Sequence, residues 1–206
     1  DNERNYITKN TKIKNLDGIE YFTHLKVLEI SYHDLKTINL SSLSNLERIS
    51  LTGNYLENID LTGLTNLNNI DLSYNKLLSI NLNELTNLKG LYLSGNQLEN
   101  IELNQLIEID EINLSDNNLT NININGLPKL WNLTLDNNKI NYLSINDCPK
   151  LGYLHCSDNL LVDIDFVNVP NLDSFYLRNN LFTHIDISKF KKLNYIDILN
   201  NSLIES

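Results

Sequence analysis

Apolar residues recur at fixed places every 21 residues, from residue 25 to the end of the chain. Counted from the start of a unit, they occupy positions 1, 4, 6, 11, 14, 16 and 19, with mostly polar residues between them. In the third unit these residues are Leu67, Ile70, Leu72, Leu77, Ile80, Leu82 and Leu85. The units follow without insertion or deletion and begin at residues 25, 46, 67, 88, 109, 130, 151, 172 and 193, the last being incomplete. A repeat of this length predicts a solenoid, because each unit buries its apolar face against the next.

Positions 4 and 6 are apolar and position 5 is polar or aromatic in most units, which is the alternation of a strand with one buried face. Because the chain returns in the same direction every 21 residues, these strands are predicted to stack in parallel. Position 3 is expected to point outward together with position 5.

A second regularity is an Asn at position 9 of every unit except the first, which has His33 there. These residues are Asn54, Asn75, Asn96, Asn117, Asn138, Asn159, Asn180 and Asn201. A short amide side chain can hydrogen-bond backbone groups that a turn leaves unpaired. The eight asparagines are therefore predicted to form a buried structural ladder.

The pattern LxxIxLxxNxL, followed by a second LxxIxL, resembles the leucine-rich repeat signature, in the bacterial 21-residue class with two strand-like segments per coil. LGYLHCSDNLL at 151–161 is similar to repeats of bacterial surface proteins. LDGIEYFTHLKVLEIS at 16–31 resembles the junction of cap and first repeat in internalin-like proteins. The resemblance implies an α/β-type repeat solenoid: a curved parallel β-sheet stack of about nine coils, mostly β and loop with little helix. It also implies an exposed bacterial recognition scaffold, extracellular or on the cell surface, without naming a ligand.

The two ends depart from the repeat. Residues 1–24 lie outside the register and are predicted to form an N-terminal cap for the solenoid at 25–206, with residues 1–12 frayed. The cap's apolar residues are spaced at threes, which predicts a short helix; they are Ile13, Leu16, Ile19, Phe22 and Leu25. The last unit stops after position 14, so its apolar face is predicted to lack cover; that face holds Leu193, Ile196, Ile198 and Leu203. Either further chain covers this end, or it pairs with a second copy in a homodimer.

Charge narrows the classes of partner. The net charge is −10 and the chain has only three Arg, whereas a phosphate-binding surface needs clustered Lys and Arg. Nucleic acid and anionic membrane surfaces are therefore not expected as partners. No run approaches 18 apolar residues, so membrane insertion is not expected either.

The sequence indicates no catalytic, cofactor or metal site. Cys148 and Cys156 fall at core positions on different sides of consecutive coils, which favours two free, buried thiols. His155 precedes Cys156 directly, so the two side chains point to opposite faces of a strand and cannot form a nucleophile–base pair. The four histidines lie at different places on the coil and match no metal-ligand spacing. GxGxxG, P-loop and GxSxG patterns are absent from the sequence.

The outward positions of the strands carry the candidate binding site, because this sheet is the concave face that leucine-rich repeat proteins commonly use. Aromatic residues and Arg, the types that dominate interface energetics, collect in the C-terminal half. The candidate ligand-binding residues are Trp131, Tyr153, His155, Tyr176, Arg178, Tyr195 and Tyr92. Ordinary strand composition also explains such residues, since strands favour Tyr and Trp. Asp136, Asp158 and Asp173 surround the group, which favours a basic partner.

These observations favour a non-enzymatic module for protein–protein recognition. A glycan-binding module is an alternative, since aromatics beside Asp, Asn and His can hold sugar rings. Three aromatic rings in a flat line would favour sugar, and a knobbly mixed patch would favour protein. A further alternative is the substrate-recognition domain of a larger enzyme whose catalytic part lies outside residues 1–206.

Overall fold

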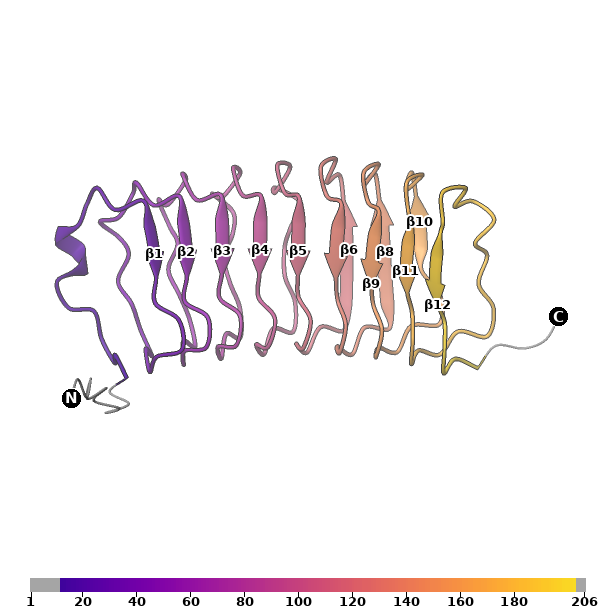
Figure 1. Ribbon diagram of the computed structural model, residues 1–206, viewed down its shortest axis with the longest axis horizontal. Helices are drawn as coiled ribbons and strands as arrows, with labels where there is room; N and C mark the ends of the chain where they lie inside the picture. The colour runs from indigo at the N-terminus through magenta and orange to yellow at the C-terminus, as the bar shows by residue number, and fades with distance from the viewer. Residues whose placement is uncertain (1–11, 203–206) are drawn as a thin grey trace, which may run out of the picture.

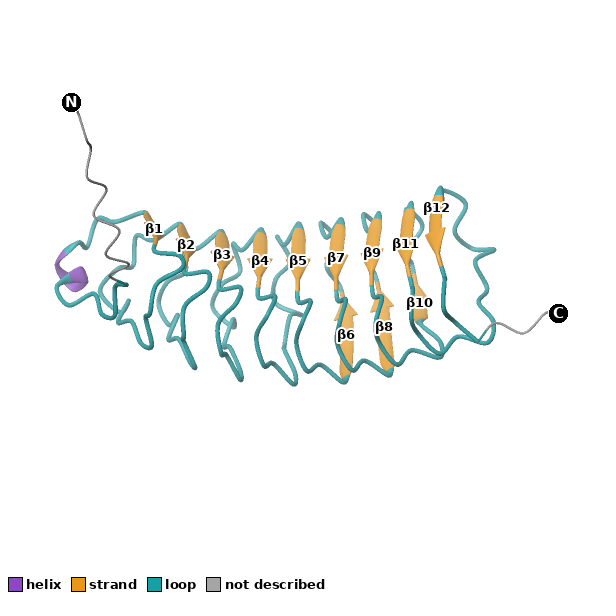
Figure 2. Cartoon of the chain, turned by 60° about the horizontal axis from the view of Figure 1, so that its bottom comes forward, coloured by secondary structure: helices purple, strands orange, loops and turns teal. Residues whose placement is uncertain are grey.

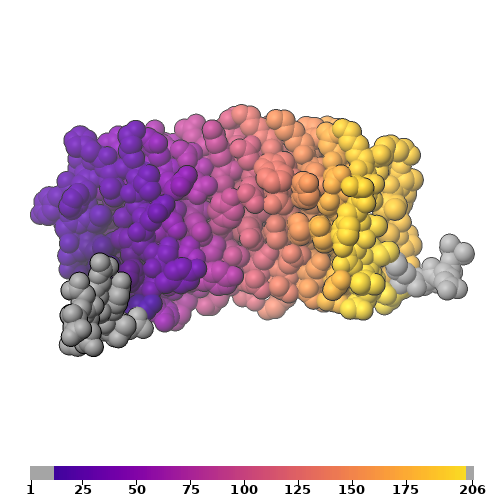
Figure 3. All heavy atoms as spheres, in the orientation of Figure 1, coloured from indigo at the N-terminus to yellow at the C-terminus, as the bar shows by residue number. Residues whose placement is uncertain are grey.

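The computed structural model describes residues 12–202 as one elongated stack of coils (Figure 1). Equivalent residues of neighbouring coils lie 21 positions apart, as in the pairing of Val27 with Arg48 and of Arg48 with Asn69. The stack makes about eight turns and contains almost no helix. Its surface is continuous from one end to the other (Figure 3). The predicted solenoid is confirmed.

The main sheet has nine short parallel strands, one from each coil, in the order of the sequence. They are β1 (Val27–Glu29), β2 (Arg48–Ser50), β3 (Asn69–Asp71), β4 (Gly90–Tyr92), β5 (Glu111–Asn113), β7 (Asn132–Thr134), β9 (Tyr153–His155), β11 (Ser174–Tyr176) and β12 (Tyr195–Asp197). The middle residue of each strand from β1 to β11 is buried, so the predicted alternation holds. The sheet follows the inner side of a shallow curve (Figure 2).

A second, three-stranded parallel sheet runs along the other side of the stack (Figure 2). Its strands are β6 (Asn121–Asn125), β8 (Tyr142–Asn146) and β10 (Asp165–Val167). The expectation of two strand-like segments in every coil is therefore wrong outside these three coils.

The three coils that form the second sheet share a proline at position 20 that the other coils lack; coil two also has a left-handed residue at position 18, Gly63, but no proline follows it. Each of the three coils has a left-handed residue at position 18, followed two residues later by the proline. Proline fixes its own φ and holds the residue before it extended, so the bend is confined to position 18 and the preceding residues remain a strand. In coils one, two, three and eight the Asn or Asp at position 15 turns the chain earlier; the Asn81 side chain, for example, accepts the N–H of Asn83 at 3.1 Å.

The asparagine ladder is present and structural. The Asn96 Oδ1 accepts the backbone N–H of Leu77 at 2.9 Å, and its Nδ2 donates to the carbonyls of Leu72 and Leu93, both at 3.0 Å. Equivalent bonds recur at all eight asparagines. They join each coil to the one before it, as the sequence predicts.

The residue before each ladder asparagine, at position 8, is left-handed in every coil, and so is Tyr32 before His33. These residues have φ between 54° and 68° and are Tyr32, Gly53, Tyr74, Gly95, Asp116, Asn137, Asp158, Asn179 and Asn200. This bend turns the chain off the main sheet and places the next side chain in the interior.

Within residues 12–24, helix is confined to the 3₁₀ turn η1 (Ile19–Tyr21), drawn at the indigo end of Figure 1. The threefold spacing reflects separate turns, in which Ile19, Phe22 and Leu25 each donate to the residue three before. Leu16, Ile19 and Leu25 pack against the core, but Phe22 is 61% exposed. The prediction that all five apolar residues share one apolar side is wrong for Phe22 and also for Ile13, which is 38% exposed.

At the other end, Leu193, Ile196 and Ile198 are partly buried against the core. Leu203, which was expected to share their face, lies outside the described residues, as do residues 1–11. What covers this end stays a prediction.

Candidate functional site

Five aromatic side chains from four successive coils lie on the outward face of the main sheet, where their rings form two contacting groups. We call Trp131, Tyr153, His155, Tyr176 and Tyr195 the aromatic patch. Trp131 and Tyr153 meet edge to face, with ring centroids 5.6 Å apart and an interplanar angle of 88°. His155 and Tyr176 stack at 4.2 Å and 8°, and Tyr195 leans on Tyr176 at 4.9 Å and 37°. The sequence prediction is thus correct in bringing these five together.

The register of the strands produces this arrangement. Ser174 pairs with Tyr153 on one side and Tyr195 on the other, while Tyr176 pairs with His155. At position 3 of consecutive coils, the small residue Ser174 lies between Tyr153 and Tyr195. Ser174 itself is only 6% exposed. Rings on adjacent strands therefore stand side by side.

His155 is neutral in this stack at neutral pH. Burial lowers the pKa of its imidazole below the ordinary value of 6.5. A neutral imidazole can stack on Tyr176 without a desolvated charge.

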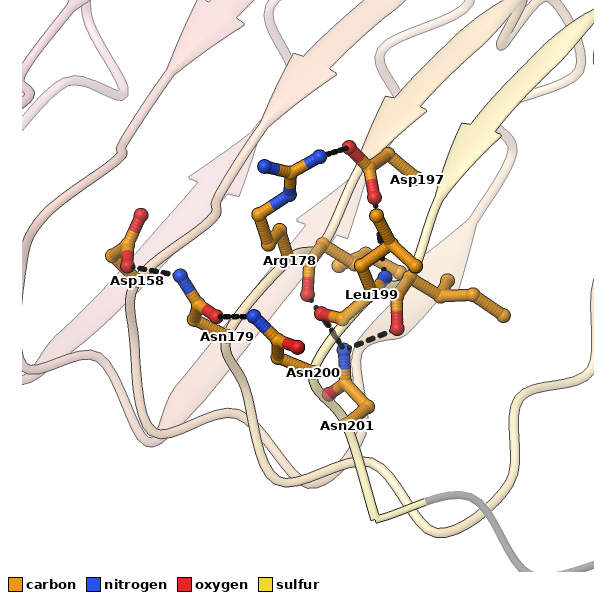
Figure 4. Close-up of polar contacts among 9 residues, drawn as sticks. Asp158, Arg178, Asn179, Asp197, Leu199, Asn200 and Asn201 are labelled. Atoms are coloured by element: carbon orange, nitrogen blue, oxygen red, sulfur yellow. Dashed lines mark hydrogen bonds and ion pairs between the residues drawn. The ribbon is translucent and has the colours of Figure 1, made fainter.

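Arg178 lies beside the patch rather than within it. Its guanidinium pairs with the Asp197 carboxylate at 2.9 Å (Figure 4). The other oxygen of Asp197 accepts the Leu199 N–H at 3.1 Å. The Arg178 side chain remains 47% exposed, so part of the guanidinium is available to a partner.

Tyr92 is not brought into the patch. Along its row it is followed by Asn113, Thr134 and then His155, so three strand spacings, about 14 Å, separate it from the stack. Its hydroxyl donates to Glu111 at 2.7 Å, and burial, with that carboxylate, raises the pKa of Tyr92 to about 12. Tyr92 therefore remains a protonated donor at neutral pH.

Glu111 and Asn132 are site residues that the sequence reading missed. The second oxygen of Glu111 accepts the Asn132 amide at 2.9 Å, and Asn132 pairs in register with Tyr153. Tyr92, Glu111 and Asn132 thus form a chain of hydrogen bonds that leads from Tyr92 to the edge of the patch. The Asn132 Oδ1 is buried and has no hydrogen-bond partner among the described residues. A signal was available in the sequence, since Glu111, Asn132 and Tyr153 are consecutive outward residues at position 3.

The acidic residues around the patch have different roles. Asp136 accepts the Ser157 N–H at 2.7 Å, yet burial, helped by the nearby carboxylates Asp158 and Asp116, raises the pKa of Asp136 to about 6. The carboxylate of Asp158 instead accepts the Asn179 amide at 2.6 Å, and Asn179 accepts that of Asn200 at 2.7 Å (Figure 4).

Solved structures identify the architecture, whereas no protein-family model and no curated protein matches the sequence. The leucine-rich repeat domain of APL1B superposes with a TM-score of 0.83 at 21% identity, over 96% of this chain and 64% of that one. The chain has the leucine-rich repeat fold. YopM, a leucine-rich effector protein from Yersinia pestis, superposes with a TM-score of 0.78 at 24% identity, over 87% of this chain and 50% of that one.

The leucine-rich repeat fold is shared by the Toll–Spatzle complex of Drosophila, with a TM-score of 0.74 at 20% identity, over 92% of this chain and 29% of that one. This chain spans less than two thirds of the length of each of these three structures. The predicted resemblance to leucine-rich repeat proteins is confirmed, and the bacterial origin stays a prediction.

The leucine-rich repeat core also explains the two cysteines. Cys148 and Cys156 are free and fully buried, as predicted. Burial raises the pKa of the Cys156 thiol well above its usual value, and His155 points to the opposite face. Within residues 12–202, no three His, Cys, Asp or Glu side chains are placed to hold a metal ion. In the same range, none of the helical structure has the length and apolar content that crossing a bilayer requires.

Proposed function

We propose that this chain recognises a protein partner through the outward face of its main sheet, centred on the aromatic patch, and does so without catalysis. The observation that carries the proposal is the packing of five exposed or half-exposed rings, as one pair and one group of three, on a stack of strands. Aromatic residues in such positions supply much of the binding energy in interfaces. Because the rings already hold one another in place, little side-chain entropy is lost when a partner docks.

The geometry favours a protein over a glycan. A sugar ring binds by lying flat on an aromatic face. Here His155 and Tyr176 use their faces on each other, Tyr195 is tilted, and Trp131 stands at right angles to Tyr153. The patch therefore offers no flat row of ring faces, and its uneven shape suits the surface of a protein.

The charge around the patch favours a basic partner. Asp158 and Asp173 lie beside it, and Asp197 is partly neutralised by Arg178. A cationic partner would be attracted by the remaining carboxylates. The Toll–Spatzle complex, a neighbour in fold, supports protein recognition as a use of this architecture. A bacterial extracellular or cell-surface location is part of the proposal and rests on the repeats at 151–161 and 16–31.

The test is selection of binders from a displayed peptide library, followed by affinity measurement on variants. We expect enrichment of peptides with Lys or Arg, and at least a tenfold weaker affinity for Tyr176→Ala, which corresponds to about 1.4 kcal/mol. Tyr142→Ala is the matched control, since Tyr142 is 49% exposed on β8 of the other sheet. Equal affinity of both variants, or selective binding of a glycan array instead of peptides, would contradict the proposal.

A further inference from the structure

A groove near the N-terminal end of the stack is built from residues that the aromatic patch does not use. It encloses about 590 Å³ and is lined by Lys14, Asp34, Lys36, Tyr55 and Lys76. This volume is within the range of small-molecule sites, roughly 300–1,000 Å³.

The repeat fixes the line of side chains along the groove. Asp34, Tyr55 and Lys76 each follow the ladder position, in coils one, two and three. The N–H of Tyr55 donates to the carbonyl of Leu35, and that of Lys76 to the carbonyl of Leu56, both at 2.8 Å. The three residues therefore stand next to one another at the spacing of the coils.

The N-terminal segment before η1, within residues 12–18, supplies the remaining wall. Ile13 accepts the N–H of Asp34 at 2.9 Å and donates its own N–H to the His33 Nδ1 at 3.3 Å. These two bonds hold the backbone against the first coil and place Lys14 at the groove. The site is thus formed by the junction of four segments of the chain.

The charge of the groove is opposite to that of the protein. Three ammonium groups and one carboxylate line it, which gives a net charge of 3 − 1 = +2 in a chain whose total is −10. Two lysines elsewhere reach carboxylates on the neighbouring coil, in the pairs Lys26–Glu47 and Lys129–Glu108. Within residues 12–202, no carboxylate lies within 4.0 Å of the ammonium groups of the groove.

One of these ammonium groups is also held in place. The Lys76 Nζ lies 5.1 Å from the centroid of the Tyr55 ring, a cation–π contact that needs no anion. The side chain is directed along the groove before any ligand arrives, while its three N–H donors remain able to bind one.

We infer that this groove binds a small anion carrying two or more negative charges, with phosphoryl groups as the best match. Lysine ammonium groups bind phosphate as point charges and with charge-assisted hydrogen bonds. Three lysines line this groove, whose volume is large enough for two or three phosphoryl units. The inference is independent of the proposed protein recognition, because the aromatic patch lies in the C-terminal half and favours a ligand of opposite charge.

Titration of the full chain with pyrophosphate and tripolyphosphate, followed by calorimetry and amide NMR, tests the inference. We expect saturable binding of one anion per chain, with the largest amide shifts at residues 34–36, 55 and 76. Lys36→Gln and Lys76→Gln should each weaken binding about tenfold. Asp34→Asn should strengthen it, because this substitution removes the one carboxylate in the lining.

Lys89→Gln is the control. This substitution removes the same charge, and Lys89 is exposed and lies outside the groove. Each lysine variant should keep the unfolding midpoint of the parent chain. The inference would be overturned if neither polyphosphate bound with a Kd below about 1 mM. It would equally be overturned if Lys89→Gln weakened binding as much as Lys76→Gln, since the effect would then reflect net charge alone.

Discussion

Replacing Asn96 by Ala tests whether the asparagine ladder holds the coils together. The Asn96 side chain is buried in the middle of the stack and joins three backbone groups. Its loss does not affect all three equally. The Leu72 carbonyl also accepts the Asn75 amide, and the Leu93 carbonyl also accepts the Asn117 amide, each at 3.0 Å. Both carbonyls therefore keep one donor in the variant.

The N–H of Leu77 is the group that loses its hydrogen-bond partner in Asn96→Ala. It donates to the Asn96 Oδ1 at 2.9 Å, and Leu77 is fully buried, so the variant leaves a desolvated donor without an acceptor. An orphaned buried donor costs about 1–3 kcal/mol, and each weakened carbonyl adds a fraction of about 1 kcal/mol. We expect the free energy of unfolding to fall by about 3 kcal/mol in total.

Urea unfolding followed by circular dichroism measures this loss, with hydrogen exchange of the Leu77 amide as a local reporter. Asn118→Ala is the matched control, because the Asn118 Oδ1 accepts only the Lys139 ammonium at the surface, and we expect a change below about 0.5 kcal/mol. Asn96→Asp keeps an acceptor for Leu77 but turns a carboxylate toward two carbonyls, so it should also destabilise the chain at neutral pH. If Asn96→Ala were as stable as Asn118→Ala, the ladder would be dispensable and the reasoning would fail.

Two further substitutions test particular sites. Asp136 has a folded pKa of about 6 against 3.8 in the unfolded chain, so its stabilising contribution is present below pH 3.8 and lost as pH rises through 6. Asp136→Asn keeps an acceptor for the Ser157 N–H and should therefore stabilise the chain at pH 7 by up to about 3 kcal/mol. It should also flatten the dependence of unfolding free energy on pH between about pH 4 and 7. An unchanged pH dependence would refute the raised pKa of Asp136. Gly95→Ala should cost about 2 kcal/mol in thermal or urea unfolding, since φ is +68° and the new Cβ would lie 2.6 Å from the Tyr74 ring. Gly126→Ala, with φ +66° but open space around it, should cost only about 1 kcal/mol, and equal losses would show that Tyr74 simply moves aside.

The fold was predictable because the same apolar positions recur in every unit, and a single register satisfies them all. Ile70, Leu91 and Ile112 illustrate this, as each is fully buried at position 4 of its coil. The ladder was predictable for the same reason, since a polar residue repeated inside an apolar pattern must be hydrogen-bonded.

The left-handed bend at position 8 was missed, although the sequence contains its signal. Seven of the nine residues there are Gly, Asn or Asp, the types that tolerate positive φ. Tyr32 and Tyr74 are the two exceptions, and they make the pattern hard to recognise in the sequence. Their rings lie against Gly53 and Gly95 of the next coil, where a side chain would collide with them. Tertiary packing thus permits a tyrosine at a position that its own backbone preference disfavours.

The binding face was only partly predictable. Counting units puts Tyr153, His155, Tyr176 and Tyr195 on neighbouring strands, and the rings do meet. The same counting places Tyr92 three strand spacings from His155. Residue type alone had grouped Tyr92 with the other aromatic residues. The stacking angles, and hence the uneven shape of the patch, depend on rotamers that no sequence pattern specifies.

Stability and recognition occupy different positions of the same unit, and this separation makes the two proposed sites testable. Positions 4, 6 and 9 point inward and are nearly invariant along the stack, whereas positions 3, 5, 10 and 12 point outward and differ from coil to coil. A substitution such as Tyr176→Ala or Lys76→Gln therefore changes a surface without opening the core, so a lost affinity can be assigned to lost contacts. Since neighbouring coils present equivalent positions side by side, a site arises wherever consecutive units carry complementary outward residues. Aromatic residues do so in coils six to nine, whereas Lys36 of coil one and Lys76 of coil three flank Tyr55 of coil two, which is why one scaffold can carry two surfaces of opposite chemistry.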